Sequence, residues 1–152
     1  MMADDFEPRF FADDAAVRRL GQGLIDCSVA REEWTHEAHL AACLWLIAER
    51  DDIDPERQLP GFIRAFNESV GGVNDDHNGY HETITQLYVA GVRQWNAVDG
   101  GAGSLVDRVN RLLASPVGRR DWPLSLYTKD RLFSVEARRG LITPDRAEWP
   151  AV

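Results

Sequence analysis

The chain has 152 residues, a length typical of one domain with a continuous core. Its shares of hydrophobic residues (44%) and charged residues (28%) are those of an ordinary globular protein rather than a disordered chain. The formal net charge of -8 disfavours nucleic acid and anionic membrane surfaces as partners, because binding either requires a surplus of Lys and Arg on one face.

Two further features concern the membrane and the compartment. The longest uncharged apolar stretch, residues 40–48, is about half as long as a bilayer-spanning helix, and the first ten residues are acidic where a secretory signal is basic. Cys27 and Cys43 lie in apolar helical patterns without CxxC spacing, so we expect buried, reduced thiols and no disulfide. These features predict a cytoplasmic protein that does not enter the membrane.

Apolar residues recur at three-to-four spacing in about five segments, and no long alternation predicts a strand. The first helix is expected over residues 13–28. The second is expected from about residue 36 to residue 50, with Thr35 as its N-cap. The third follows Asp54-Pro55, a capping residue and a residue suited to the first helical position, and ends at Gly71.

The fourth helix is expected to begin near residue 79 or 80 and to end before Asp99. The fifth starts after the cap Ser104 and stops at Ser115-Pro116, since proline cannot continue a helix. Beyond this point the helical pattern weakens.

These elements predict an all-α fold with a single domain over residues 1–152. We expect a single helical bundle of about five helices over residues 13–115. The remaining residues, 116–152, hold many of the prolines and are expected to form an irregular C-terminal tail that wraps the bundle, with one short helix over about 134–139.

Three of the four histidines lie in two short motifs. Trp-Thr-His-Glu-Ala-His-Leu opens the second predicted helix, and Gly-Tyr-His-Glu-Thr opens the fourth. At about 100° per residue, His36 and His39 lie roughly 60° apart beside the apolar stripe, so both face inward. His81 lies at the edge of the stripe of the fourth helix and also faces inward, whereas Glu82 is turned away.

The helix order suggests that these histidines meet. Short connections make consecutive helices antiparallel, so the second and fourth helices run in one direction with their first turns at the same end. His36, His39 and His81 then converge, and three imidazoles suit a divalent transition metal with one open position. We therefore predict a zinc, nickel or iron site on these histidines, in which Glu82 orients a ligand or acts as a general base.

Other residues border this predicted site. Trp34 and Tyr80 directly precede the two histidine motifs, and we expect them to wall a small-molecule pocket together with Glu82. His77 lies in a polar turn and is expected to be solvated. The chain has no HExxH, no GxSxG elbow and no glycine-rich nucleotide loop, so protease, serine-hydrolase and nucleotide chemistry find no support.

Two functions are consistent with this pattern. The first is a divalent-metal-binding helical protein that performs hydrolytic or oxidative chemistry on a small molecule. The alternative is a non-catalytic module that binds a small molecule or a partner, because histidines in the first turn of a helix also serve as structural hydrogen-bonding groups.

The chain resembles a family of small, functionally uncharacterised bacterial helical proteins. The resemblance runs from the second predicted helix to the tail and implies a shared bundle, but it implies no activity. The matching segments are His36 to Leu40 (HxxHL), Tyr80 to Thr83 (YHET), Tyr127, Arg131-Leu132-x-Ser134, Ala137-Arg138 and Pro144-Asp145.

Overall fold

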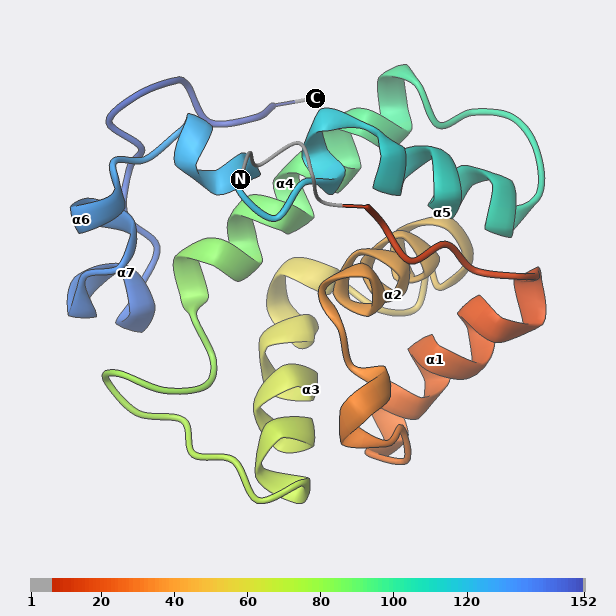
Figure 1. Ribbon diagram of the computed structural model, residues 1–152, viewed down its shortest axis with the longest axis horizontal. Coiled ribbons are helices and arrows are strands. Elements are labelled where there is room, and N and C mark those ends of the chain that lie inside the picture. The colour runs from red at the N-terminus through yellow and green to blue at the C-terminus, as the bar shows by residue number, and fades with distance from the viewer. Residues whose placement is uncertain (1–6, 152) are drawn as a thin grey trace.

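A computed structural model describes residues 7–151 of the chain. Within this range the regular secondary structure is helical, with no strand, which confirms the all-α prediction (Figure 1). Five longer helices are followed by two short ones and are interspersed with 3₁₀ turns. The elements are α1 (Asp14–Asp26), η2 (Arg31–Glu33), α2 (His36–Glu49), α3 (Pro55–Ser69), α4 (Glu82–Val98), α5 (Leu105–Ala114), η3 (Pro116–Gly118), η4 (Trp122–Ser125), α6 (Lys129–Leu132) and α7 (Val135–Arg139).

The helix starts follow from local capping chemistry. The side chain of Thr35 accepts a hydrogen bond from the backbone of Ala38 at the start of α2, and Ser104 accepts one from Asp107 at the start of α5. Such caps satisfy backbone N–H groups that have no partner inside the helix. Both N-caps were predicted from the sequence, and both are confirmed.

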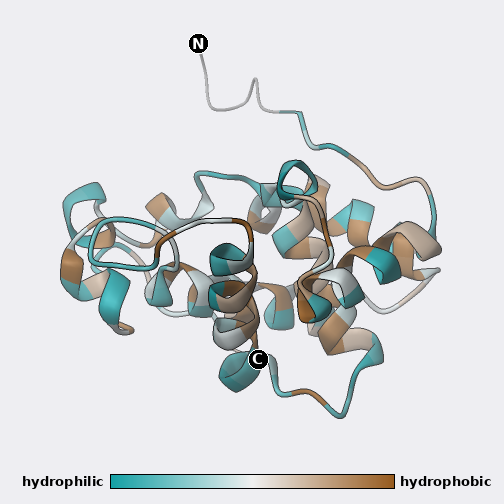
Figure 2. Cartoon of the chain, turned by 90° about the horizontal axis from the view of Figure 1, so that it is seen from below, coloured by the Kyte–Doolittle hydropathy of each residue, from teal (hydrophilic) through white to brown (hydrophobic). Residues whose placement is uncertain are grey.

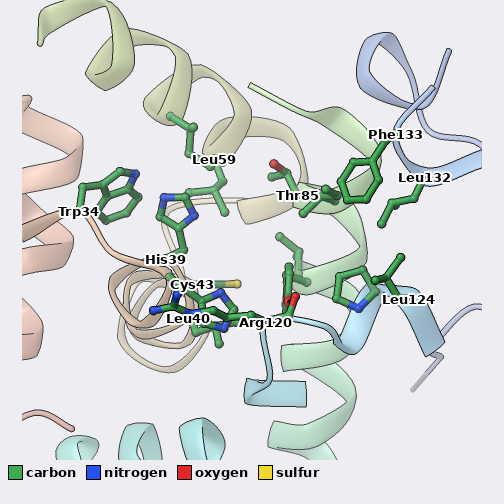
Figure 3. Close-up of a pocket in the computed structure, with 16 residues that line it drawn as sticks. Trp34, His39, Leu40, Cys43, Leu59, Thr85, Arg120, Leu124, Leu132 and Phe133 are labelled. Carbon is green, nitrogen blue, oxygen red and sulfur yellow. The ribbon is translucent and has the colours of Figure 1, made fainter. Parts of the chain in front are cut away.

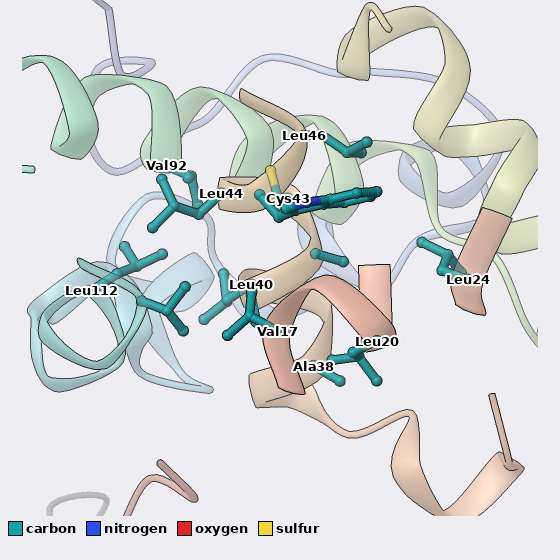
Figure 4. Close-up of a cluster of buried hydrophobic side chains, with 14 of the residues drawn as sticks. Val17, Leu20, Leu24, Ala38, Leu40, Cys43, Leu44, Leu46, Val92 and Leu112 are labelled. Carbon is teal, nitrogen blue, oxygen red and sulfur yellow. The ribbon is translucent and has the colours of Figure 1, made fainter. Parts of the chain in front are cut away.

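Helix α2 occupies the centre of the fold. Its buried residues are distributed around most of its circumference, as in a helix with neighbours on every side. It contacts α1, α3, α4 and α5. In Figures 1 and 4, α4 runs across α2 instead of alongside it. The single bundle of about five helices is therefore not confirmed, because short connections fix which helices are neighbours but not the angle at which they cross.

Two hydrophobic clusters hold the structure together. The larger one surrounds α2, and Figure 4 shows side chains of α1, α4 and α5 pointing toward it. The smaller cluster joins α4 to residues that follow α5, and its buried members are Leu87, Leu126, Tyr127 and Leu132. Hydrophobic residues lie beside hydrophilic ones along the helices in Figure 2, as expected for amphipathic helices around a shared interior.

The tail packs against the start of α4. Thr83 donates its hydroxyl to the carbonyl of Gly140 at 2.9 Å and accepts from the backbone N–H of Ile142 at 3.2 Å. The hydroxyl of Tyr127 donates to the carbonyl of Ile142. Helix α7 matches the one short helix predicted in the tail, whereas α6, η3 and η4 were not predicted.

Among the helices of residues 7–151, none combines the length and the apolar character that crossing a bilayer requires.

The contact between α1 and α2 leads to a stability prediction. A Cβ atom on Gly21 of α1 would lie 2.2 Å from a ring carbon of Trp45, whereas a Cβ atom on Gly61 of α3 would meet nothing within 4 Å. We expect Gly21→Ala to lower the free energy of unfolding by about 1–3 kcal/mol, because the added methyl overpacks the interface. Gly61→Ala should raise it by about 0.4–1 kcal/mol, since alanine restricts the unfolded chain.

Urea unfolding of the two variants measures both effects. Stabilisation by both substitutions would contradict the close approach of α1 to Trp45.

Candidate functional site

A cavity of about 280 Å³ lies between α2, α3, α4 and the tail. Figure 3 shows Trp34 and His39 on one side of it, and Leu132 and Phe133 on the opposite side. Most of its wall is apolar, and its polar members come from α2, α4 and the segment after η3. The lining residues are Trp34, His36, His39, Leu40, Cys43, Leu59, Ile63, Ile84, Thr85, Tyr88, Val89, Arg120, Pro123, Leu124, Leu132 and Phe133.

A second cavity, of about 380 Å³, adjoins the first. The two share five wall residues, which are Trp34, His39, Ile63, Ile84 and Thr85. The second cavity extends toward the start of α4, where Tyr80 and His81 also line it. The three histidines of the sequence motifs therefore line one pair of adjoining cavities, with His39 common to both.

His36 is held by the segment that follows α5. Its Nε2 lies 2.8 Å from the carbonyl oxygen of Gly118, and a carbonyl only accepts, so Nε2 carries the proton and donates. The imidazole also meets the ring of Tyr88 edge-on, with 5.7 Å between ring centroids. Burial lowers the pKa of His36 despite the hydrogen bond to Gly118, and the ring is neutral at pH 7.

His81 caps helix α4. Its Nδ1 accepts a hydrogen bond from the backbone N–H of Ile84 at 3.1 Å, and its Nε2 donates to the carbonyl of Leu132 at 2.8 Å. The residue is 8% exposed, and its burial lowers the pKa of the imidazole. The sequence predicted an inward-facing His81 inside the first turn of the fourth helix. The structure buries it, but as the N-cap residue of a helix that begins at Glu82.

His39 differs from the other two histidines. Its ring stacks at a tilt on Trp34, with 4.3 Å between ring centroids, and no residue in the range 7–151 hydrogen-bonds either ring nitrogen. The ring lines both cavities, and His39 as a residue is solvent-exposed. Desolvation by the protein atoms around the ring, with a smaller contribution from His36, lowers the pKa of His39 to about 4.

The predicted metal centre on His36, His39 and His81 gains no support from this geometry. Within residues 7–151, no three His, Cys, Asp or Glu side chains form a group that could hold a metal ion. Both ring nitrogens of His81 have protein partners, and Nε2 of His36 has one. The assumption that α2 and α4 run side by side also fails, since α4 crosses α2. A zinc, nickel or iron site therefore stays a prediction.

The residues predicted to wall a pocket are placed as follows. Trp34 lines both cavities, and Tyr80 lines the second. Glu82 accepts a hydrogen bond from the Tyr80 hydroxyl, but it is not among the residues that line either cavity. It therefore contacts a wall residue of the second cavity without facing its interior.

A buried charge lies beside the first cavity. Glu37, on α2, is 1% exposed, and neither of its carboxylate oxygens has a hydrogen-bond partner within residues 7–151. The guanidinium of Arg120, which lines the cavity, lies 3.9 Å from Glu37. Because a buried carboxylate without an opposite charge is costly, Arg120 is the group that makes this position tolerable for Glu37.

Several lining residues were not identified from the sequence as parts of a site. Tyr88 lies at a helical spacing typical of core residues, and Arg120 and Phe133 belong to a tail without periodicity. Cys43 was correctly expected to be buried, but it also lines the cavity. Burial raises the pKa of the Cys43 thiol to about 12, so it is protonated and a poor nucleophile.

The capping role of His81 can be tested by substitution. His81→Ala removes the acceptor for the Ile84 N–H and the donor to Leu132, so it should lower the free energy of unfolding by about 1–3 kcal/mol. His81→Asn restores an N-cap acceptor but is too short to reach Leu132, so its stability should lie between those of His81→Ala and the wild type. Urea unfolding measures both; a His81→Ala protein as stable as the wild type would refute the role.

The histidines also predict a pH dependence of stability. The pKa values of His36, His39 and His81 are lowered in the folded state relative to the ordinary value of 6.5. Below pH 6.5 the unfolded chain therefore binds protons that the native state does not. Stability should be complete above about pH 6.5 and decline as the pH falls toward the folded-state values, about 4 for His39.

Urea midpoints at pH 7 and pH 5 test this decline, because carboxyl groups titrate mainly below this window. His39→Gln should flatten the pH dependence, because it removes one of the three groups that cause it. Equal midpoints at the two pH values in the wild type would contradict the prediction.

Comparison with known proteins does not place the chain in a family. No protein-family model, curated protein or solved structure matches it. Its function has to be inferred from the chemistry of the two adjoining cavities.

Proposed function

We propose that this protein is a non-catalytic module that binds a small apolar molecule in the cavity between α2, α3, α4 and the tail. The observation that carries the proposal is a largely apolar cavity of about 280 Å³ with one imidazole, that of His39, open to it and bonded to no residue in the range 7–151. Apolar walls with a few placed polar groups are typical of small-molecule sites.

The size of the site supports this proposal. Small-molecule pockets commonly begin near about 300 Å³, and the first cavity approaches that value before the adjoining one is considered. The aromatic ring of Trp34 and the aliphatic side chains of Leu59 and Ile63 offer contact area to an apolar ligand.

The polar groups favour binding over catalysis. The Cys43 thiol is protonated, and the Nε2 protons of His36 and His81 are donated to backbone carbonyls. Nucleophilic catalysis needs an activated nucleophile next to a base, and the cavity wall offers no such pair among the described residues. A metal enzyme remains the competing function, but His81 could bind a metal only by giving up one of its two hydrogen bonds.

A substitution that fills the cavity tests the proposal. Ile63, on α3, lies in the wall shared by the two cavities, and Ala65 is an exposed residue on the same helix. We expect the wild type to bind p-xylene and 4-methylphenol saturably, with NMR chemical-shift changes at the lining residues. Ile63→Trp should reduce this binding by at least about 10-fold, since the added indole occupies the cavity, and Ala65→Trp should leave it unchanged.

The absence of saturable binding in the wild type, or equal binding by the two variants, would overturn the proposal. Stoichiometric zinc, nickel or iron in protein purified without a histidine tag would favour the metal centre instead.

A further inference from the structure

We infer that the molecule bound in this cavity is an uncharged apolar compound with a hydroxyl group, an alcohol or a phenol, that hydrogen-bonds to His39. The inference rests on the proposed function and specifies its ligand. It follows from the position of one side chain on the wall common to two cavities and from the pairing of the charged groups around it.

His39 offers hydrogen bonds that the protein does not use. A neutral imidazole has one N–H donor and one bare nitrogen acceptor, and no residue in the range 7–151 takes up either. Contact with Trp34 orients the ring, and the ring lines both cavities. A hydroxyl both donates and accepts, so it complements whichever nitrogen of His39 faces the ligand.

Two other polar groups of the first cavity already use their hydrogen-bond donors within the protein. Nε2 of His36 donates to the carbonyl of Gly118, and the hydroxyl of Tyr88 donates to the carbonyl of Arg119 at 2.8 Å. Both donors are thus directed at backbone carbonyls.

The charges next to the cavity balance. The guanidinium of Arg120 lies 3.9 Å from the buried carboxylate of Glu37, and His39 is neutral at pH 7. A carboxylate ligand would lose its hydration without meeting an uncompensated positive charge. An uncharged ligand avoids this loss.

Three probes of matched shape test the inference at pH 7. They are p-xylene, 4-methylphenol and 4-methylbenzoate, which differ in one substituent, a methyl, a hydroxyl or a carboxylate. We expect 4-methylphenol to bind about 5- to 10-fold more tightly than p-xylene, the ratio that one net hydrogen bond provides. 4-Methylbenzoate should bind more weakly than p-xylene. NMR titration gives the three dissociation constants.

Substitution of His39 assigns the preference to this residue. His39→Leu should keep the affinity for p-xylene and remove the preference for 4-methylphenol, since leucine neither donates nor accepts. His39→Phe, which keeps a ring beside Trp34, provides the same comparison if His39→Leu does not fold. His77→Leu is the matched control, and it should retain the full preference because His77 is exposed in a turn and lines neither cavity.

The outcomes separate this inference from the proposed function. Equal binding of p-xylene and 4-methylphenol, a preference that persists without His39, or tightest binding of 4-methylbenzoate would overturn the inference and leave the binding function standing. If no probe binds saturably, both are overturned.

Discussion

The burial of α2 on most of its surface is the constraint on which the rest of the structure depends. A helix with Leu, Ala and Trp around most of its circumference is stable in water only when other elements cover each side. Four helices do so, and α1 approaches closely enough that Gly21 contacts Trp45 without a side chain between them. The first turn of α2 carries most of its polar residues, including Glu37, and the segment after α5 covers this turn with Arg120 and Gly118.

Local signals in the sequence were sufficient for most helix boundaries. Thr35 and Ser104 cap their helices as predicted, and α3 begins at Pro55 directly after Asp54, because such start signals depend on a few adjacent residues. The start of α4 was predicted too early, since His81 is an unusual N-cap and Asn78, of a type that commonly caps helices, stands just before it. The arrangement of the helices in space was not predictable in this way, because crossing angles depend on side-chain packing between residues far apart in the chain.

The candidate site was predictable in part for the same reason. The motifs identified Trp34, His39 and Tyr80, which line the cavities, since each lies next to a helix start with a recognisable pattern. The predicted convergence of the histidines on a metal assumed that α2 and α4 are parallel. The two helices cross instead, and His36 and His81 bind different backbone carbonyls, those of Gly118 and Leu132. The opposite wall comes from a tail without periodicity, so no spacing rule could assign Phe133 to the site.

The hydrogen bond between His81 and Leu132 has a consequence for the order of folding. It joins residues separated by 51 positions, and the bond from His36 to Gly118 spans 82, so the far wall of the cavity depends on closing long loops. Helices α1, α3, α4 and α5 can pack around α2 before the tail packs against α4. The cavity is complete only once the tail supplies its part of the wall. A ligand that needs both walls therefore favours the docked tail by mass action, and occupancy of the cavity should protect tail amides from hydrogen exchange.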